Sequence, residues 1–282
     1  MLLYGKPVAL SIEEKTAELL KLVKCKMIFP TLCVIRMGEN PDDITYERIL
    51  LKKGERLGIE VRTASIGADA SQFEVESTVR SINFDREIHG ILLLRPLNKS
   101  IDESKICDLI STDKDVDGVT PYSAAHSFYG IKRGFYPCTA ESCMRILDYY
   151  DVDLEGKDVV VVSRSSVIGK PVSMLLLDKN ATVTICHSKT KNLAEKCAKA
   201  DVLITAVGHA GFFDEKYLRE NQYVIDVGIN SDKNNNLCGD VDMAAAEKVG
   251  CHYSPVPGGI GTVTSSLLLW HTVLAAFNTL KK

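Results

Sequence analysis

Short apolar runs and amphipathic stretches alternate along the first half of the chain. The apolar runs, which predict strands, are 31–38, 60–66 and 88–97. The stretches between and after them, which predict helices, are 42–58, 71–84 and 101–110. Strands that alternate with helices in this way indicate a parallel sheet with crossover helices. The run "IHGILLLRPL" is almost wholly apolar, as expected of a strand that is covered on both faces.

The second half repeats the pattern. Its predicted strands are 157–163, 182–188, 200–208 and 222–230, and helices are expected from about 170 and over 191–199. The segment between the halves, near 120–140, is rich in turn residues and poor in periodicity, which favours a domain boundary there. The sequence therefore predicts an α/β protein of two domains.

Composition excludes several classes of protein. The chain is 45% hydrophobic and 25% charged with a net charge of −3, which is typical of a soluble globular protein and argues against a nucleic-acid partner. Its nine cysteines are scattered and form no CxxC pair. Reduced thiols in a cytoplasmic protein are therefore expected, with neither a disulfide framework nor a metal site. The N-terminus lacks the pattern of a signal peptide.

The C-terminal stretch 262–280 contains no Lys, Arg, Asp or Glu, and its length would just span a bilayer. Its Thr, Ser, Asn and His residues favour instead a helix that is buried within the protein. A C-terminal membrane anchor is the alternative.

The segment "VVVVSRSSVIGKP" (159–171) has the form of a strand, a tight turn and a helix start, where α/β proteins hold nucleotide phosphates. It carries only Gly169, whereas the dinucleotide fingerprint has three glycines, so the glycines alone support a cofactor loop and a plain crossover equally. About 20 residues further on, an acid would bind a ribose 2′-hydroxyl. Ser188, Lys189 and Lys191 stand there instead, which favours NADP over NAD.

Several phrases occur together in a specific order. They are "GILLLRPL", "KDVDG", "YPCT", "SRSSVIGKP", "ATVTICHSKT", "VIDVGIN", "GDVD" and "SPVPGGIGTVT". This order resembles the bifunctional methylenetetrahydrofolate dehydrogenase/cyclohydrolase family over nearly the whole chain. The resemblance implies a three-layer α/β folate domain (1–135), on which a C-terminal helix (264–282) packs, and a Rossmann-like NADP domain (136–263). A cleft between the domains and a homodimer are implied as well.

The resemblance also implies roles for single residues. Tyr46 would stack on the folate ring system, and Asp117 would accept hydrogen bonds from the pterin edge. Pro257, Gly258 and Gly259 would lie along the folate. The positions implied for the cofactor are Ser163, Arg164, Ser165, Ser188 and Ile229, the last acting through its backbone. From the residues alone, Tyr46 could equally be a core aromatic and Asp117 a turn residue.

Two positions depart from the family pattern. Leu50 stands where the family has a lysine, and Leu94 where it has a glutamine. Lys53, seven residues after Tyr46, lies near the same helix face and roughly 10 Å further along, so it is a candidate substitute catalytic residue. Lys52 should point away from that helix face, and Arg95, which follows Leu94 on a strand, should face the side opposite to Leu94. A solvated surface charge is the other interpretation of Lys53.

The expected function is NADP-dependent oxidation of 5,10-methylenetetrahydrofolate to 5,10-methenyltetrahydrofolate in one-carbon metabolism, which supplies purine biosynthesis. We expect the cyclohydrolase step to 10-formyltetrahydrofolate to be weak or absent, because leucine can neither donate nor accept a proton. Two alternatives stay open. One is a fully bifunctional enzyme in which Lys53 or water compensates. The other is a catalytically dead folate-binding protein, although Tyr46, Asp117 and Arg164 speak against it.

Overall fold

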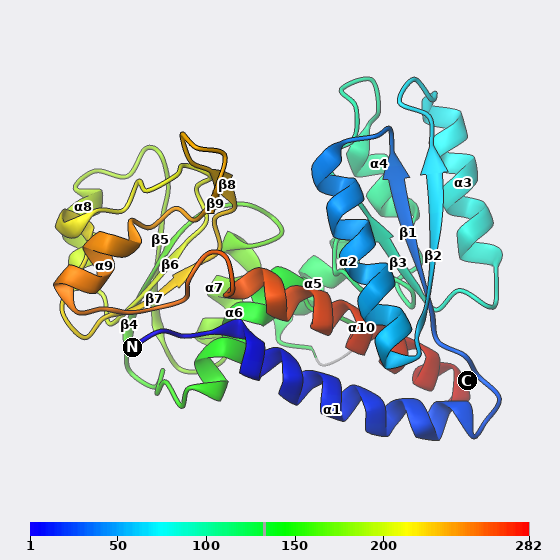
Figure 1. Cartoon of the computed structure of the whole chain (residues 1–282), viewed down its shortest axis with the longest axis horizontal. Coiled ribbons are helices and arrows are strands. Elements are labelled where there is room, and N and C mark those ends of the chain that lie inside the picture. The colour runs from blue at the N-terminus through cyan, green and yellow to red at the C-terminus, as the bar shows by residue number, and fades with distance from the viewer. Residues whose placement is uncertain (132–133, 282) are drawn as a thin grey trace. The chain divides into compact units, whose positions relative to one another are not determined.

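The computed structural model describes residues 1–131 and 134–281, which form two compact units (Figure 1). The first unit comprises residues 11–126, 134–136 and 265–281, and the second comprises 1–10, 127–131 and 137–264. The expected division at 135/136 and at 264 differs from this mainly at the N-terminus. Residues 1–10 belong to the second unit, and the first three of them pair with its last strand: Leu3 N–H donates to the Tyr253 carbonyl at 2.8 Å.

The first unit is built on a three-stranded parallel sheet in the order β2-β1-β3. Its strands are β1 (Thr31–Met37), β2 (Glu60–Ile66) and β3 (Gly90–Leu93). The helices assigned to this half of the chain are α1 (Gly5–Lys24), α2 (Pro41–Leu57), α3 (Gln72–Phe84), α4 (Glu103–Leu109) and α5 (Pro121–Tyr129). Each predicted strand and helix of this half is present, and β3 is shorter than the apolar run that predicted it.

Local sequence explains where these helices begin and end. Asn40 caps α2 by accepting the Asp42 N–H, Pro41 occupies the first turn, and Gly58 ends the helix in the left-handed region. Helix α3 starts with a full capping box between Ser71 and Glu74.

Helices cover both faces of this sheet. Side chains from α3 and α4 join those of β1 and β3 in one buried cluster, which includes Ile35, Val79, Ile91 and Ile106. On the other face, α2 lies against β2, and α10 (Ile260–Asn278) lies against β3. The first unit therefore has the expected three layers.

Helix α10 is the charge-free C-terminal stretch. By length and composition alone it could cross a membrane, but 67% of its apolar window is buried. Its polar groups have partners within the first unit: Ser266 Oγ donates to Glu13 Oε1 at 2.9 Å, and the His271 ring contacts the Val116 carbonyl at 2.8 Å. The expected packing of this helix on the first unit is confirmed; residue 282 lies outside the described residues.

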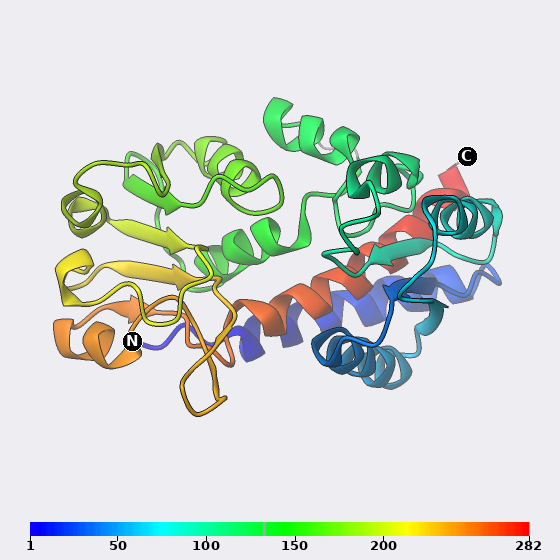
Figure 2. The same cartoon turned by 90° about the horizontal axis from the view of Figure 1, so that it is seen from above.

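The second unit is built on a five-stranded parallel sheet in the order β10-β7-β6-β4-β5. The strands are β4 (Asp158–Val162), β5 (Thr182–Cys186), β6 (Val202–Thr205), β7 (Tyr223–Asp226) and β10 (His252–Tyr253). The other elements are α6 (Cys138–Tyr149), α7 (Gly169–Leu177), α8 (Leu193–Lys199), η1 (Glu215–Tyr217), α9 (Met243–Val249) and a small hairpin, β8 (Asn230–Ser231) with β9 (Leu237–Cys238). Figure 2 shows the arrows of the sheet pointing the same way.

The strand order of the second unit creates a switch point. After β4 the chain passes to β5 on one side, and it then crosses to β6 on the other side of β4. In doubly wound sheets ligands bind outside the carboxyl ends of the strands at such a point. The loops that follow β4 and β6 are therefore the place to look for a nucleotide site.

Candidate active site

The loop after β4 has the form that a phosphate site requires. Arg164 and Ser166 are exposed, whereas Ser163 is buried and Ser165 half-buried. The Ser165 hydroxyl accepts the N–H groups of Ile168 at 3.1 Å and Gly169 at 3.3 Å. Ser165 thus shapes the turn that leads into α7, and Arg164 supplies the exposed charge.

The one glycine of this loop, Gly169, stands where helix α7 closely approaches the end of β4. A Cβ at Gly169 would overlap the Ser163 carbonyl, so only glycine allows α7 to start against the end of β4. Close helix–strand packing is the role of the third glycine in the dinucleotide fingerprint. The geometry therefore agrees with a cofactor loop.

Ser188 follows the neighbouring strand. Val162 and Cys186, the last residues of β4 and β5, pair in register, so the two following loops begin side by side. The Ser188 loop is a closed turn, in which Thr190 N–H donates to the His187 carbonyl at 2.8 Å and Thr190 Oγ1 accepts the His187 N–H at 2.9 Å. Residues 183–194 contain no acid. Arg164 and Ser188 therefore lie at one edge of the sheet.

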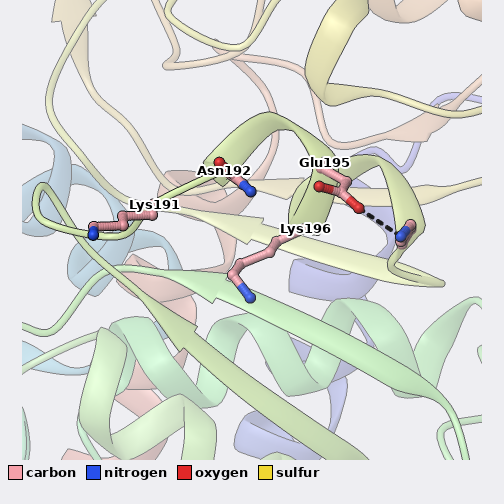
Figure 3. A pocket seen from close by; sticks show the side chains of 5 residues that line it. Lys191, Asn192, Glu195 and Lys196 are labelled. Atoms are coloured by element: carbon pink, nitrogen blue, oxygen red, sulfur yellow. Dashed lines mark hydrogen bonds and ion pairs between the residues drawn. The ribbon is translucent and has the colours of Figure 1, made fainter.

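A cationic hollow of about 330 Å³ lies beyond this turn, lined by Lys191, Asn192, Glu195, Lys196 and Lys199 (Figure 3). Glu195 is paired with Lys199 at 2.7 Å. The side chains of Lys191 and Lys196 extend away from that pair in Figure 3. The positive charge on this part of the surface therefore favours a ribose that carries a phosphate over one with free hydroxyl groups.

Ile229 lies in the loop after β7, at the same edge of the sheet, and is 69% exposed. An exposed isoleucine on this edge is consistent with a contact through its backbone. Two buried carboxylates lie near this loop in the chain: Asp226 is the last residue of β7, and Asp240 follows β9. They belong to the phrases "VIDVGIN" and "GDVD", but the sequence alone indicates no role for either. For Asp226 the available signal was an acid directly at the end of an apolar strand; for Asp240 the local sequence carried no such signal.

Tyr46 and Asp117 belong to the first unit, and both are half-buried. In "KDVDG", the other two charged side chains serve the fold. Lys114 Nζ donates to the carbonyls of Asn83 at 2.9 Å and Asp85 at 2.6 Å, at the end of α3. Asp115 accepts the Thr120 N–H at 2.9 Å and the Ser123 hydroxyl at 2.6 Å. The motif therefore places Asp117 in a turn that is held on both sides.

Leu50 and Leu94 are both buried. Each therefore puts an apolar side chain, without a proton donor or acceptor, where the family pattern has a polar group. Pro257 and Gly258, assigned to the second unit, are exposed and half-exposed, and Gly259 is buried. The Gly258 carbonyl accepts the Gly5 N–H at 2.8 Å, which anchors this turn.

Lys53 is not a surface charge, because its side chain is only 13% exposed. Its Nζ donates to Ser265 Oγ at 2.7 Å and Ser266 Oγ at 2.9 Å, and it lies 3.5 Å from Glu13 Oε1. Burial lowers the pKa of Lys53, and the Glu13 charge opposes that shift. The interpretation of Lys53 as solvated charge is therefore wrong. Its amine is engaged by α1 and α10, which favours a structural role.

Glu13 is the acceptor of this cluster. Arg56 also donates to it at 2.8 Å. Burial alone would raise the pKa of Glu13, but the hydrogen bonds from Arg56 and Ser266 and the charge of Lys53 outweigh it, and the pKa is lowered. Glu13 is thus held as a carboxylate. Among residues 1–131 and 134–281, no group of three His, Cys, Asp or Glu side chains is arranged to hold a metal ion.

Comparison with known families matches both parts of the chain. The family model "Tetrahydrofolate dehydrogenase/cyclohydrolase, catalytic domain" matches residues 3–117, and the model of the NAD(P)-binding domain of the same family matches residues 137–280. Bifunctional protein FolD of Clostridium botulinum (strain Langeland) is 47% identical over 276 residues, 98% of each chain. The protein of the same name from Clostridioides difficile is 45% identical over 271 residues, covering 96% of this chain and 94% of that one.

Solved structures agree. FolD from Campylobacter jejuni superposes with a TM-score of 0.95 at 36% identity, over 99% of each chain. The Trypanosoma brucei methylenetetrahydrofolate dehydrogenase-cyclohydrolase, solved with NADP and an inhibitor, superposes with a TM-score of 0.94 at 30% identity, over 100% of this chain and 99% of that one. The chain therefore belongs to the tetrahydrofolate dehydrogenase/cyclohydrolase family.

Proposed function

We propose that this protein catalyses the NADP-dependent oxidation of 5,10-methylenetetrahydrofolate to 5,10-methenyltetrahydrofolate, as a step of one-carbon metabolism that supplies purine biosynthesis. The observation that carries the proposal is the edge of the five-stranded sheet. There the register of β4 and β5 brings Arg164 and Ser188 to adjacent strand ends without an acid beside them. The Trypanosoma relative, 30% identical, was solved with NADP.

NADP, when bound, supplies the hydride acceptor. The chain's own residues bind and orient the two partners. Arg164 supplies a positive charge for the 2′-phosphate, and the turn into α7 supplies N–H groups for the pyrophosphate. Tyr46 offers a face on which the folate ring can stack, and Asp117 offers acceptors for its N–H groups.

Hydride loss from the methylene bridge does not require a protein base. The lone pairs of the two bridge nitrogens stabilise the cation that forms at the carbon. Holding two reactants in a reactive geometry can supply roughly 7–11 kcal/mol of such a barrier. The two leucines at 50 and 94 therefore do not prevent this half-reaction.

Hydrolysis of the methenyl bridge has different demands. Water must attack the carbon, and protons must move to and from positioned groups, which typically contribute about 10²–10⁴-fold. Leu50 and Leu94 provide no such group, and the amine of Lys53 is bound by Ser265, Ser266 and Glu13. We therefore propose a weak or absent cyclohydrolase activity. Full bifunctionality is the second candidate, because the relatives at 45–47% identity are named bifunctional.

The test is to follow NADP reduction and methenyltetrahydrofolate decay separately at neutral pH. We expect rapid reduction of NADP and decay close to the uncatalysed rate. Robust hydrolysis that disappears in Lys53→Ala would favour the second candidate. Absence of NADP reduction together with tight folate binding would favour the catalytically dead alternative instead.

We further propose a cytoplasmic homodimer with a folate substrate and with neither nucleic acid nor membrane as a partner. Strand β5 is the edge of its sheet in this chain, and Ile185 on it is exposed. An edge strand leaves backbone groups that a second copy can pair with. Sedimentation velocity should give about twice the 31.0 kDa of one chain.

A further inference from the structure

Two buried aspartates lie where the strands of the five-stranded sheet end. Asp226 is the last residue of β7 and Asp240 follows β9, and their side chains are 2% and 0% exposed. Their partners are N–H and O–H groups, and none of the ion pairs among the described residues includes either. Burying a carboxylate without a cation is costly unless several donors reach it. The role of the two aspartates therefore follows from the groups that donate hydrogen bonds to them.

Asp240 holds the loop after β6. Its Oδ2 accepts the Val207 N–H at 2.6 Å, and its Oδ1 accepts the His209 N–H at 2.9 Å. Gly208, between them, has a φ of 71°, a conformation that side chains other than glycine rarely adopt. The carboxylate thus fixes both N–H groups on either side of a tight bend.

The same carboxylate reaches the loop after β7. Asn230 Nδ2 donates to Asp240 Oδ1 at 2.9 Å. Asp240 therefore connects the loop that follows β6 to the loop that follows β7.

Asp226 fixes Asp240 in turn. Its Oδ1 accepts the N–H groups of Gly228 at 2.9 Å and Asp240 at 3.1 Å, and its Oδ2 accepts the Val241 N–H at 2.9 Å. Glycines pack directly against both carboxylates. A Cβ at Gly239 would overlap the Asp226 carboxylate, and a Cβ at Gly228 would overlap the Asp240 carboxylate. The two aspartates and the two loops therefore form one interlocked unit.

The strand order assigns these loops to one half of the cofactor. Strands β4 and β5 carry the fingerprint turn and the Ser188 turn, which serve the adenosine half of a dinucleotide. Strands β6 and β7, across the switch point, form the other half of the sheet. While the N–H groups of Val207 and His209 point inward, Gly208, His209 and Ile229 are exposed at this edge.

We propose that Asp240 is a positioning residue for the nicotinamide half of the cofactor. Its carboxylate, held in place by Asp226, fixes the loops at Val207–His209 and Gly228–Asn230 in the conformation that receives the nicotinamide riboside. This inference rests on the proposed NADP-dependent function, and it concerns only the half of the cofactor that Arg164 and Ser188 do not reach.

The variant Asp240→Asn tests it in the full chain. An amide keeps one acceptor oxygen but turns an NH₂ group toward an N–H donor of Val207 or His209. We expect NADP affinity, measured by titration calorimetry, to weaken about tenfold or more, since a hydrogen bond to a charged group is lost and a donor is left unpaired. Adenosine 2′,5′-bisphosphate, which lacks the nicotinamide half, should bind within about twofold of its wild-type affinity.

Asp242→Asn is the matched control. Asp242 lies two residues further on, is exposed, and caps α9 by accepting the N–H groups of Ala244 at 3.0 Å and Ala245 at 3.2 Å. Asparagine caps a helix equally well, so both affinities should be unchanged. If Asp240→Asn does not fold, Asn230→Ala decides the question, because it removes only one of the bonds to Asp240. It should weaken NADP about threefold and leave the bisphosphate unchanged.

Equal losses for NADP and for adenosine 2′,5′-bisphosphate would overturn the inference, because they would indicate a general disturbance of the domain. Unchanged NADP affinity in a folded Asp240→Asn protein would overturn it as well. The proposed function is tested separately, by the wild-type protein. If the wild type binds neither ligand, the proposed function is contradicted, and the inference that rests on it is contradicted as well. If the wild type binds both ligands and only the variants give the wrong result, the inference alone is contradicted.

Discussion

At the scale of single residues, the site contrasts charges that face solvent with charges that are enclosed. Arg164 is exposed at the carboxyl edge of its sheet, where it can meet a ligand. Asp226 and Asp240 are enclosed at the same edge and act on the backbone. Asp117 follows two charged residues, Lys114 and Asp115, whose side chains hydrogen-bond within the fold. The residue type alone does not distinguish these roles.

The exposed charge of Arg164 gives the first prediction. Arg164→Ala should weaken NADP about tenfold or more and NAD only slightly, because a charge-assisted contact to the 2′-phosphate is lost. Steady-state KM values for the two cofactors measure this. Lys179→Ala is the control, since Lys179 is also an exposed cation of this unit but pairs with Asp148 at 2.9 Å. Equal losses for both cofactors would show that Arg164 does not recognise the 2′-phosphate.

The enclosed charge of Asp226 predicts a dependence of stability on pH. Burial raises the pKa of Asp226 to about 6, against the lowering effect of the N–H groups of Val241, Asp240 and Gly228. Between an ordinary carboxyl pKa near 4 and this value, the folded protein holds more protons than the unfolded chain. The contribution of Asp226 to the free energy of unfolding therefore falls as the pH rises through this interval, and it is constant above the interval.

The measurement compares the wild type with Asp226→Asn, which cannot titrate. The difference between their free energies of unfolding, wild type minus variant, should decrease by about 2–3 kcal/mol from pH 4 to pH 7. Urea unfolding at intervals across that range gives both values, and other titrating groups cancel in the comparison. Parallel curves for the two proteins would contradict the raised pKa.

At the scale of elements, the Lys53 cluster joins three helices of the first unit. Lys53 and Arg56 come from α2, Glu13 from α1, and Ser265 and Ser266 from α10. Breaking a buried ion pair leaves its partner's charge uncompensated, which usually costs several kcal/mol. The cluster therefore stabilises the packing of α2, the helix that carries Tyr46.

The third prediction concerns this cluster. Lys53→Ala should lower the free energy of unfolding by about 2–4 kcal/mol, because Glu13 and two serines lose a buried donor. The dehydrogenase rate per folded molecule should change little, since the amine is held by the fold. The neighbouring exposed Lys52→Ala should leave both quantities unchanged. Thermal unfolding together with NADP reduction decides it, and a stable but inactive Lys53→Ala protein would point to a catalytic amine.

At the scale of the whole molecule, the apolar C-terminal helix is accounted for by burial. Helix α10 has partners in Glu13 and Val116, and most of its apolar window is covered. A membrane would have to replace each of these contacts. The resemblance to folate enzymes over 98% of the chain includes this helix.

We therefore predict that the native protein is recovered in the aqueous fraction of a cell lysate without detergent. Fractionation by ultracentrifugation, followed by the NADP assay on both fractions, measures this. The variant Trp270→Lys, at a half-buried position of α10, should reduce the amount of folded protein rather than release it from a membrane. Activity confined to detergent extracts of the membrane fraction would contradict the prediction.

The sequence by itself determined the strands, the two α/β units and the family. Parallel strands that are covered on both faces must be apolar, so they are visible as runs, and glycines and caps mark the ends of α2 and α3. It did not predict α1 or α6, nor that residues 1–3 pair with β10. A pairing between the two ends of the chain leaves no local pattern.

Only the tertiary structure decided what the charged residues do. Lys53 stands in a helix whose sequence allows a solvated, a catalytic or a structural lysine, and the arrival of Ser265 and Glu13 from distant segments excludes the first and favours the last. Asp240 could be a surface acid, until β6 and β7 bring Val207, His209 and Asn230 around it. Local periodicity reports which side chains are buried, but the partners of a buried charge come from elements far apart in the chain, and only the folded arrangement brings them within bonding distance.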